Sequence, residues 1–344
     1  MRARNRPRMR AVRLQAIDRE HGPEQFRVDQ VDDPRAGPGE ILIRIARAAF
    51  NRRDVFISQG LYPGIVMPCI PGSDGVGTVA AHGEGASGPA VGSRVVIDPT
   101  LGWGPDERIW RRDAQVLGMP HQGTMAEYLA VPAENVHPAP PSLSDDEAGA
   151  MPLGGVTAYR ALVARGGCTK DDVVLLPGIG GGVQTFALLF AKKLGAKVIV
   201  TSSSDEKLAR AKALGADVAI IYNASERWEK DVAAVDGGPS LVVDSIGGET
   251  FAKALNVARY GARVVSYGGT TGDAKIRPFS VFWKQLDIMG SSMGSPHDFA
   301  AMLALWDGSI HPVVDSIFAL DDVVDAARKV DHGDQFGKIV LALT

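Results

Sequence analysis

The hydrophobic pattern of the chain changes near residue 150. Before that point, short apolar stretches are separated by Gly and Pro, which is typical of a series of short β-strands. Many strands of this kind predict a compact, partly closed β domain. The stretches that predict strands are residues 9–17, 25–31, 39–50, 73–81, 93–98 and 124–131.

From about residue 171, apolar runs alternate with amphipathic helix-like stretches. This alternation predicts right-handed βαβ units and a parallel sheet covered on both faces, so the fold class is α/β. Six such strands make one complete dinucleotide-type domain. The tail predicts helix, helix and strand, and we expect it to return to the first domain. The expected strands are 173–176, 197–200, 217–221, 241–244, 262–267 and 286–291, and the expected helices between them 184–194, 205–214, 226–235 and 249–258.

Composition and charge exclude several classes of protein. The 344 residues are 45% hydrophobic and 22% charged, as in a soluble globular protein, and the net charge of -3 gives no reason to expect nucleic acid or an anionic membrane as partner. The basic start is not followed by an apolar run, so we expect a solvated tail before a fold that begins near Met9, rather than a signal peptide. The two cysteines, Cys69 and Cys168, fit a reducing cytoplasm.

A cluster of glycines follows the predicted strand at 173–176 and precedes a predicted helix. Glycines let the backbone turn sharply and approach a pyrophosphate, whose charge the free N–H groups of the helix start then bind. The spacing is not a strict GxGxxG, because Val183 stands in the third place. A sheet-capping loop without a ligand is the alternative. The glycines of this turn are Gly178, Gly180, Gly181 and Gly182.

The second strand ends in serines, Ser202 and Ser203, where chains that prefer NAD carry an acid for the ribose 2′-OH. Lys207 follows in the next helix. Hydroxyl donors and an ammonium suit a 2′-phosphate, which predicts NADP(H) as cofactor. Two local alternatives stay open: Ser204 as the N-cap of that helix, and an acid at 205–206 that turns toward the ribose.

The segment GIGGGVQ at 178–184 resembles the GxSGGVG turn of the zinc-independent quinone oxidoreductase-like branch of the medium-chain dehydrogenase/reductase superfamily. The similarity covers nearly the whole chain from Met9. It implies a GroES-like catalytic domain at 9–152, completed by about 295–344, and a Rossmann NADP-binding domain at 153–294, with the active site between them. It also implies a homodimer. Gln184 departs from the family's last glycine, which predicts a helix set slightly farther out.

Other segments also resemble parts of that family's cofactor site, among them GGVTAYRAL at 154–162 and AIIYN at 219–223. The resemblance implies that Thr157 approaches the nicotinamide amide and that Tyr222 lies near the 2′-phosphate. Together with the glycine turn and the serines, the expected cofactor-binding residues are Thr157, Gly178, Gly180, Gly181, Gly182, Val183, Ser202, Ser203, Lys207, Tyr222, Ser245, Ile246, Gly268, Gly269, Thr270, Ser292 and Lys338.

The zinc ligands of the superfamily's metal-dependent members are not matched here. Asn51 stands at the position of the catalytic Cys, and Ser73 and Asp74 stand at the His-Glu pair. Residues 98–123, which correspond to the structural zinc lobe, contain no cysteine. Because zinc sites need N or S ligands in sets of three or four, no metal is predicted.

Without a Lewis acid, hydride delivery favours a conjugated acceptor, since a quinone or an α,β-unsaturated carbonyl spreads the incoming charge. Hydrogen-bond donors at the oxygen, each contributing about 2.7–4 kcal/mol, then suffice. The resemblance implies that Asn51 and Tyr62 face the substrate. From the residues alone, Tyr62 is equally a loop tyrosine without a role. Asp54 is either catalytic or a buried acid bonded to backbone amides. Phe56 replaces a Tyr of some members, which leaves proton delivery to solvent.

The sequence therefore predicts an NADPH-dependent, zinc-independent reductase of quinones or α,β-unsaturated carbonyl compounds. An alcohol or aldehyde dehydrogenase of the same superfamily with a relocated zinc site is one alternative. A protein that binds NADPH as a sensor or partner, without turnover, is another.

Overall fold

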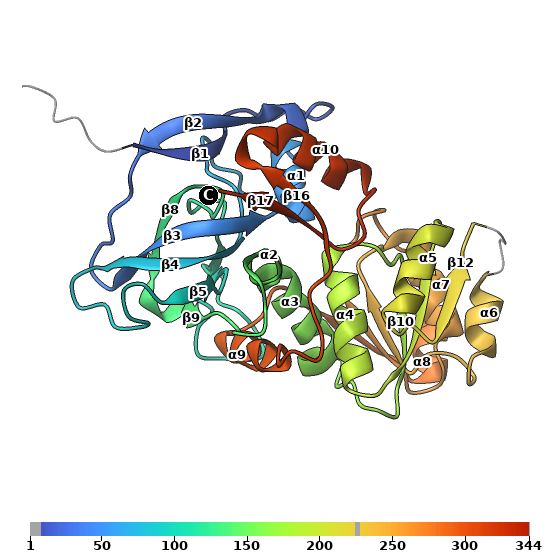
Figure 1. Ribbon diagram of the computed structural model, residues 1–344. Coiled ribbons are helices and arrows are strands. Elements are labelled where there is room, and N and C mark those ends of the chain that lie inside the picture. The colour runs from blue at the N-terminus through green and yellow to red at the C-terminus, as the bar shows by residue number, and fades with distance from the viewer. Residues whose placement is uncertain (1–7, 224–227, 344) are drawn as a thin grey trace, which may run out of the picture. The chain divides into compact units, whose positions relative to one another are not determined.

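The computed structural model describes residues 8–223 and 228–343. The chain folds as two compact units. Unit 1 contains the residues up to Gly154 and those from Ser295 onwards, and unit 2 is Gly155–Gly294. Figure 1 shows strands in both units, with most of the helices around the sheet of unit 2. The mixed α/β class predicted from the sequence is confirmed.

Unit 1 is built on a seven-stranded sheet of order β16-β17-β3-β4-β5-β9, in which β8 also pairs with β3. Strand β17, from the C-terminal segment, runs antiparallel to β3, with Val340 opposite Ala49. The strands are β3 (Glu40–Ala49), β4 (Asp74–His82), β5 (Arg94–Ile97), β8 (Tyr128–Pro132), β9 (Val136–Pro138), β16 (Val314–Ala319) and β17 (Lys338–Ala342). Two smaller pairs are β1 (Arg8–Leu14) with β2 (Phe26–Asp32), and β6 (Thr100–Leu101) with β7 (Gln115–Val116).

The core of unit 1 follows from the alternation along β3, where Ile41, Ile43 and Ile45 are fully buried on one face. The edge-to-face pair Phe26–Phe50 extends this core toward the first helix, α1 (Arg52–Ser58). Helix α10 (Val323–His332) packs against α1, as Figure 1 shows. The other helices of the unit are α2 (Asp145–Ala150) and α9 (Pro296–Leu305), with 3₁₀ turns at Pro23–Gln25, Ala133–Asn135 and Leu320–Asp322.

Unit 2 holds a parallel six-stranded sheet of order β12-β11-β10-β13-β14-β15. Its strands are β10 (Val173–Leu176), β11 (Lys197–Ser202), β12 (Val218–Ile221), β13 (Leu241–Asp244), β14 (Arg263–Ser266) and β15 (Asp287–Gly290). All six sequence-predicted strands form. The chain moves outward from β10 in both directions, so the carboxyl ends of β10 and β13 mark the switch point at which this fold binds dinucleotides.

The helices of unit 2 are α4 (Gly182–Lys193), α5 (Asp205–Ala213), α6 (Trp228–Ala234), α7 (Gly248–Val257) and α8 (Pro278–Lys284). Helix α3 (Pro152–Tyr159) continues into a π-helical segment, Arg160–Arg165. The helix predicted at 226–235 begins outside the described residues, and its described part starts at Trp228. Helix α8 was not predicted from the sequence. In the stretches 8–223 and 228–343, no helix is both long and apolar enough to cross a membrane.

Candidate functional site

Asn51 begins helix α1 in unit 1, and the turn before that helix is held by buried polar bonds. The Asn51 backbone is extended, and its N–H donates to Oδ2 of Asp54 at 2.8 Å. Oδ1 of Asp54 accepts from the backbone N–H of Gly72 at 3.3 Å. Complete burial raises the pKa of Asp54. These two bonds are the contacts expected if Asp54 is a buried acid bonded to backbone amides rather than a catalytic residue.

Lys338 fixes the Asn51 side chain. Its Nζ lies 2.7 Å from the carbonyl oxygen of Phe50, from Oδ1 of Asn51 and from Oδ2 of Asp74. Asn51 Nδ2 also donates to Oδ2 of Asp74, at 2.8 Å. An ammonium only donates and a carboxylate only accepts, so this pairing fixes which way the Asn51 amide faces. One of the two Nδ2 hydrogens remains for a further acceptor.

The Asp74 carboxylate is the centre of this cluster. It is fully buried and also accepts from the backbone N–H of Leu153. Its partner Lys338 is only 3% exposed. A buried carboxylate needs such compensation, because desolvation of an unpaired charge costs several kcal/mol, on the order of the whole stability of a domain. All three Lys338 donors are used in unit 1, so contact with a cofactor, the role expected from the sequence, would require one of these bonds to break.

The donor set at the positions of the zinc ligands does not suit zinc. Asn51 and Asp74 share the Lys338 ammonium, and the Ser73 hydroxyl donates to the carbonyl oxygen of Leu117. A neutral amide and a hydroxyl are poor zinc ligands compared with thiolate and imidazole. Within residues 8–223 and 228–343, no group of three or more His, Cys, Asp or Glu side chains is arranged to hold a metal ion.

Two further side chains surround this cluster. The Arg53 guanidinium donates to Ser73 Oγ at 2.9 Å. The ring of Tyr62, half-buried, lies with its centroid 5.0 Å from the guanidinium carbon of Arg53. The structure thus brings Asn51, Asp54 and Tyr62, the sequence-predicted catalytic residues, into one neighbourhood, since Arg53 lies between Asn51 and Asp54 in the chain.

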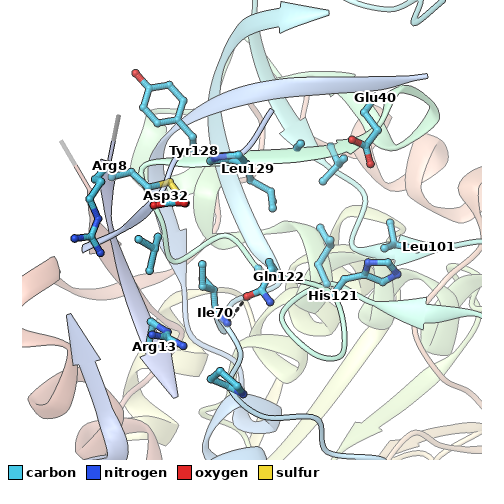
Figure 2. Close-up of a pocket in the computed structure, with 18 of the residues that line it drawn as sticks. Arg8, Arg13, Asp32, Glu40, Ile70, Leu101, His121, Gln122, Tyr128 and Leu129 are labelled. Atoms are coloured by element: carbon cyan, nitrogen blue, oxygen red, sulfur yellow. Dashed lines mark hydrogen bonds between the residues drawn. The ribbon is translucent and has the colours of Figure 1, made fainter. Parts of the chain in front are cut away.

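Unit 1 also contains a separate cavity of about 670 Å³ between the β1–β2 pair, β8 and the loop at 117–123. Figure 2 shows the Gln122 side chain in its lining, where Oε1 accepts from the backbone N–H of Ile70 at 2.7 Å. Charged side chains at Arg8, Asp32 and Glu40 contribute to an otherwise mainly apolar wall. No sequence-predicted site residue lines this cavity.

The glycine turn of unit 2 leaves the start of α4 open. Gly178 has a φ of +66° and Gly180 a φ of +146°, conformations that favour glycine. Gly181 is the N-cap of α4 and no side chain caps the helix there. A Cβ on Gly181 would meet no atom within 4 Å. Free helix N–H groups beside open space fit a diphosphate.

Gln184 lies in the first turn of α4, where the family has its last glycine. Its Nε2 donates to the carbonyl oxygens of Pro177, at 3.3 Å, and Val243, at 3.0 Å. The buried side chain therefore links the ends of β10 and β13. Its Oε1 is buried and has no hydrogen-bond partner among the described residues.

The end of β11 carries hydroxyl groups and no acid. Ser202 is buried and its Oγ accepts from the Ser204 N–H at 3.2 Å, whereas Ser203 is exposed. Ser204 Oγ accepts from the Lys207 N–H at 3.3 Å, so the N-cap role considered for Ser204 is confirmed. Tyr222 is bonded through its N–H to the Ser202 carbonyl oxygen and is 40% exposed.

Other expected cofactor residues gather at the same edge of the sheet. The side chain of Ile246 approaches Gly178, and the N–H of Thr270 donates to the Ser245 carbonyl oxygen at 3.1 Å. The loop at 268–272 therefore lies against the end of β13. Thr157, in α3, is buried and its Oγ1 has no partner in the described structure. The glycine turn and the open start of α4 fit the diphosphate of a dinucleotide.

Arg53 and Gln184 are site residues whose roles the sequence did not predict. Two adjacent arginines begin the seven-residue helix α1, and one of them is buried in the structure. No local signal separates the two, because adjacent residues of a helix can both lie on its polar face. The hydrogen bonds from Gln184 to Pro177 and Val243 could not be predicted from the local sequence either.

Known proteins resemble the chain along most of its length. Residues 37–141 match the alcohol dehydrogenase GroES-like domain, and residues 182–307 match the zinc-binding dehydrogenase family. The zinc-type alcohol dehydrogenase-like protein YogA of Leptosphaeria maculans is 36% identical, over 92% of this chain and 94% of that protein. An acryloyl-coenzyme A reductase of Sulfurisphaera tokodaii is 29% identical, over 93% and 97%.

A solved structure described as an NAD-dependent alcohol dehydrogenase has the same fold. It is 36% identical, with a TM-score of 0.90 over 97% of this chain and 99% of that one. These relatives bear the names of different oxidoreductases.

Proposed function

Because the chain belongs to the medium-chain dehydrogenase/reductase superfamily, with a GroES-like unit 1 and a Rossmann unit 2, we propose that it is an NADPH-dependent reductase of quinones or α,β-unsaturated carbonyl compounds that needs no catalytic metal. The observation that carries the proposal is the Lys338 ammonium. It bonds the two side chains, Asn51 and Asp74, that stand where zinc-dependent members hold their metal.

Because the Lys338 ammonium is held between these side chains, no metal ion is needed there to balance the charge of Asp74. The negative charge of Asp74 is already balanced by Lys338. Bringing Zn²⁺ into contact with Asn51 and Asp74 would set two cations against each other at van der Waals distance, which the low dielectric of a buried site penalises strongly. The proposal therefore assigns charge balance at this position to the protein itself.

A conjugated acceptor suits such a site. NADPH, when bound, would supply a hydride, which is one proton with two electrons, and would itself become NADP⁺. The acceptor's π electrons move onto its carbonyl oxygen as the hydride reaches the β-carbon, and a proton from solvent completes the product. The free Nδ2 hydrogen of Asn51 stabilises the developing negative oxygen, with Lys338 and Asp74 as positioning residues. A preorganised donor of this kind contributes about 2.7–4 kcal/mol.

NADPH is proposed over NADH because β11 ends without a carboxylate. The exposed hydroxyl of Ser203 and the nearby Lys207 and Tyr222 suit a 2′-phosphate. Both acids at 205–206 are exposed in the first turn of α5, whose N-cap is Ser204. The N-cap role of Ser204 uses its Oγ as an acceptor and leaves its hydroxyl proton available.

A homodimer formed through unit 2 completes the proposal. Strand β15 is at the edge of its sheet, and an exposed edge invites pairing with another strand. Helix α8, which follows β14 and precedes β15, exposes Phe279, Phe282 and Trp283, and the Phe279 and Trp283 rings stack with centroids 5.5 Å apart. A cluster of exposed aromatic rings beside a free strand edge favours a second copy of the chain as occupant.

The alternative of an alcohol dehydrogenase is favoured by the names of several relatives. A panel of acceptors with NADPH and NADH in parallel separates the two. The proposal expects NADPH oxidation with 1,4-benzoquinone or 2-cyclohexenone and none with cyclohexanone. Turnover of cyclohexanone with the reduced cofactors, or of cyclohexanol with NADP⁺ or NAD⁺, and of no conjugated acceptor would contradict it. NADPH binding without turnover of any member of the panel would favour the sensor alternative.

A further inference from the structure

Arg53 is a buried cation held only by neutral groups. Its side chain lies in α1 and is 8% exposed. Nη1 donates to Ser73 Oγ at 2.9 Å and to the Leu117 carbonyl oxygen at 2.7 Å. Nη2 donates to the Met119 carbonyl oxygen at 3.3 Å. A guanidinium has five N–H donors, so these three bonds leave two donors unused.

No carboxylate of residues 8–223 and 228–343 lies within ion-pair distance of this guanidinium. The adjacent acid, Asp54, directs its oxygens to the backbone N–H groups of Asn51 and Gly72 instead. The Nε–H of Arg53 is buried and has no acceptor in the described structure. Arg stays charged at any physiological pH, so a buried guanidinium that has no direct ion pair and one unused buried donor carries a free-energy cost.

This cation lies within the neighbourhood of Asn51, Tyr62 and Asp74. Its partner Ser73 immediately precedes Asp74, whose own charge Lys338 already balances. Burial raises the pKa of the other acid of the cluster, Asp54, and the nearby charge of Arg53 opposes that rise. The half-buried Tyr62 ring covers the guanidinium face, with its centroid 5.0 Å away.

We propose that Arg53 is an anion-binding residue of the substrate site, which takes a carboxylate or enolate oxygen of a small conjugated acyl compound on its Nε–H and its free Nη2–H. These two donors lie on one side of the guanidinium fork, the geometry that pairs with two oxygens or with one bridging oxygen. The inference rests on the proposed function and assigns the acceptor's charge to a named residue.

The competing explanation is purely structural. Bonds from Arg53 to the Leu117 and Met119 carbonyl oxygens fasten the loop at 117–119 to α1, and that task accounts for two of the three donors in use. It does not account for the buried, unpartnered Nε–H. A test therefore has to follow that N–H directly, rather than stability or activity.

The first measurement uses the intact protein labelled with ¹⁵N-arginine and titrated with sodium crotonate, with neutral crotonamide in parallel. The proposal expects one buried Arg Nε–H resonance to shift with crotonate and not with crotonamide, and to be missing from the spectrum of Arg53→Lys. An Arg53 Nε–H resonance unaffected by crotonate would overturn the proposal, and this readout requires no variant to bind the ligand.

The second measurement is calorimetric titration of crotonate into variants. Arg53→Lys keeps the charge but loses the fork, and its dissociation constant should rise about tenfold or more, since a charge-assisted bond is lost. Arg52→Met is the matched control, because Arg52 donates to the carbonyl oxygens of Val330 and Asp331 and stacks on Phe56. It should bind crotonate as the unmodified protein does. Equal affinity in Arg53→Lys and the unmodified protein would also overturn the inference.

Both measurements omit NADPH and turnover, so they fail or succeed independently of the proposed function. Crotonate binding at Arg53 in a protein that reduces no conjugated acceptor would leave this inference standing and contradict the proposed reaction. Reduction of enones by a protein whose Arg53 does not bind crotonate would support the proposed reaction and contradict this inference.

Discussion

Lys338 Nζ lies 2.7 Å from Asp74 Oδ2, and both side chains are removed from solvent. The two residues are 264 positions apart in the chain, on β17 and at the start of β4. Their bond therefore joins the C-terminal strand to the centre of unit 1. It also fixes the amide of Asn51, on which the proposed chemistry depends.

Removal of this buried cation should be costly. Lys338→Met leaves the Asp74 carboxylate without its counterion, and we expect the free energy of unfolding to fall by about 3–5 kcal/mol in urea titrations. The double variant Asp74→Asn with Lys338→Met should lose less than the sum of the two single losses, because the uncompensated charge is gone. Lys197→Met, which breaks the exposed pair with Asp236, should cost less than about 1 kcal/mol. Equal losses for Lys338 and Lys197 would contradict the structural role.

Gly181 allows cofactor binding to be separated from folding. Its φ of −75° suits any residue, and a Cβ there would meet open space. Gly181→Val should therefore keep the melting temperature while the added side chain blocks approach to the α4 start, and we expect the NADPH dissociation constant to rise at least about tenfold, a loss of roughly 1.4 kcal/mol.

Gly178 provides the contrasting control. Its φ is +66°, and a Cβ would come within 2.7 Å of the Ile246 side chain. Gly178→Ala should therefore lower the melting temperature itself. Unchanged NADPH affinity in a folded Gly181→Val protein would show that the cofactor does not lie across this turn.

Lys207 should distinguish the two nicotinamide cofactors. Loss of its ammonium in Lys207→Met removes a charge proposed to face the 2′-phosphate, and the NADPH dissociation constant should rise by about 10- to 100-fold, the effect of one charge-assisted bond. NADH affinity should change little. Lys212→Met, on the same helix but bonded to the Asp217 carbonyl oxygen, is the matched control. Parallel losses for both cofactors would contradict the NADP assignment.

Asp98 should make the stability of the protein depend on pH. Burial raises its pKa to about 8 from an ordinary value of 3.8, so the folded protein keeps a proton that the unfolded chain has released. Its contribution is complete below about pH 4 and is lost as the pH rises through about 8. Between those limits the free energy of unfolding should fall by up to about 1.4 kcal/mol per pH unit.

Asp98→Asn should flatten that slope in urea titrations between about pH 6 and 8. Asp113→Asn is a suitable control, because bonding to Arg111 lowers the pKa of Asp113, which therefore does not titrate in this window. A slope that survives in Asp98→Asn would assign the pH dependence to another group. Asp244, whose pKa burial raises to about 6, contributes with the same sign at lower pH.

The proposed dimer is tested by sedimentation of Trp283→Asp. Trp283 is 57% exposed, so the change should leave the folded unit intact, and a charge in the aromatic cluster of α8 should convert the dimer to a monomer. Ile109→Asp, at an exposed apolar residue of unit 1, should leave the mass unchanged. If the unmodified protein sediments as a monomer, the proposed dimer is contradicted.

The sequence predicted features that depend on neighbouring residues. The strands of unit 2, the glycine turn and the N-cap of α5 follow from local patterns of apolar residues, glycine and serine, and each is present. Helix α8 was not predicted because it does not have one buried apolar face and one exposed polar face. Its aromatic residues Phe279, Phe282 and Trp283 are all exposed.

The candidate site of unit 1 depends on residues distant in the chain, and there the sequence predicted less. It indicated Asn51 but not what holds it, because Lys338 and its acceptors, at 50–51 and at Asp74, lie on three segments that only the folded sheet brings together. Nor does local sequence reveal which of two adjacent arginines is buried. The partners of Arg53 come from the loop at 117–119 and from Ser73, more than a helix length away.

The claim that the protein's own ammonium takes the place of a metal is tested most directly by one assay. Purified protein is treated with a zinc chelator, its metal content is measured, and NADPH oxidation by 2-cyclohexenone is followed before and after treatment. We predict substoichiometric zinc and an unchanged rate. One zinc per chain, with activity that disappears on chelation and returns when zinc is added back, would contradict the account.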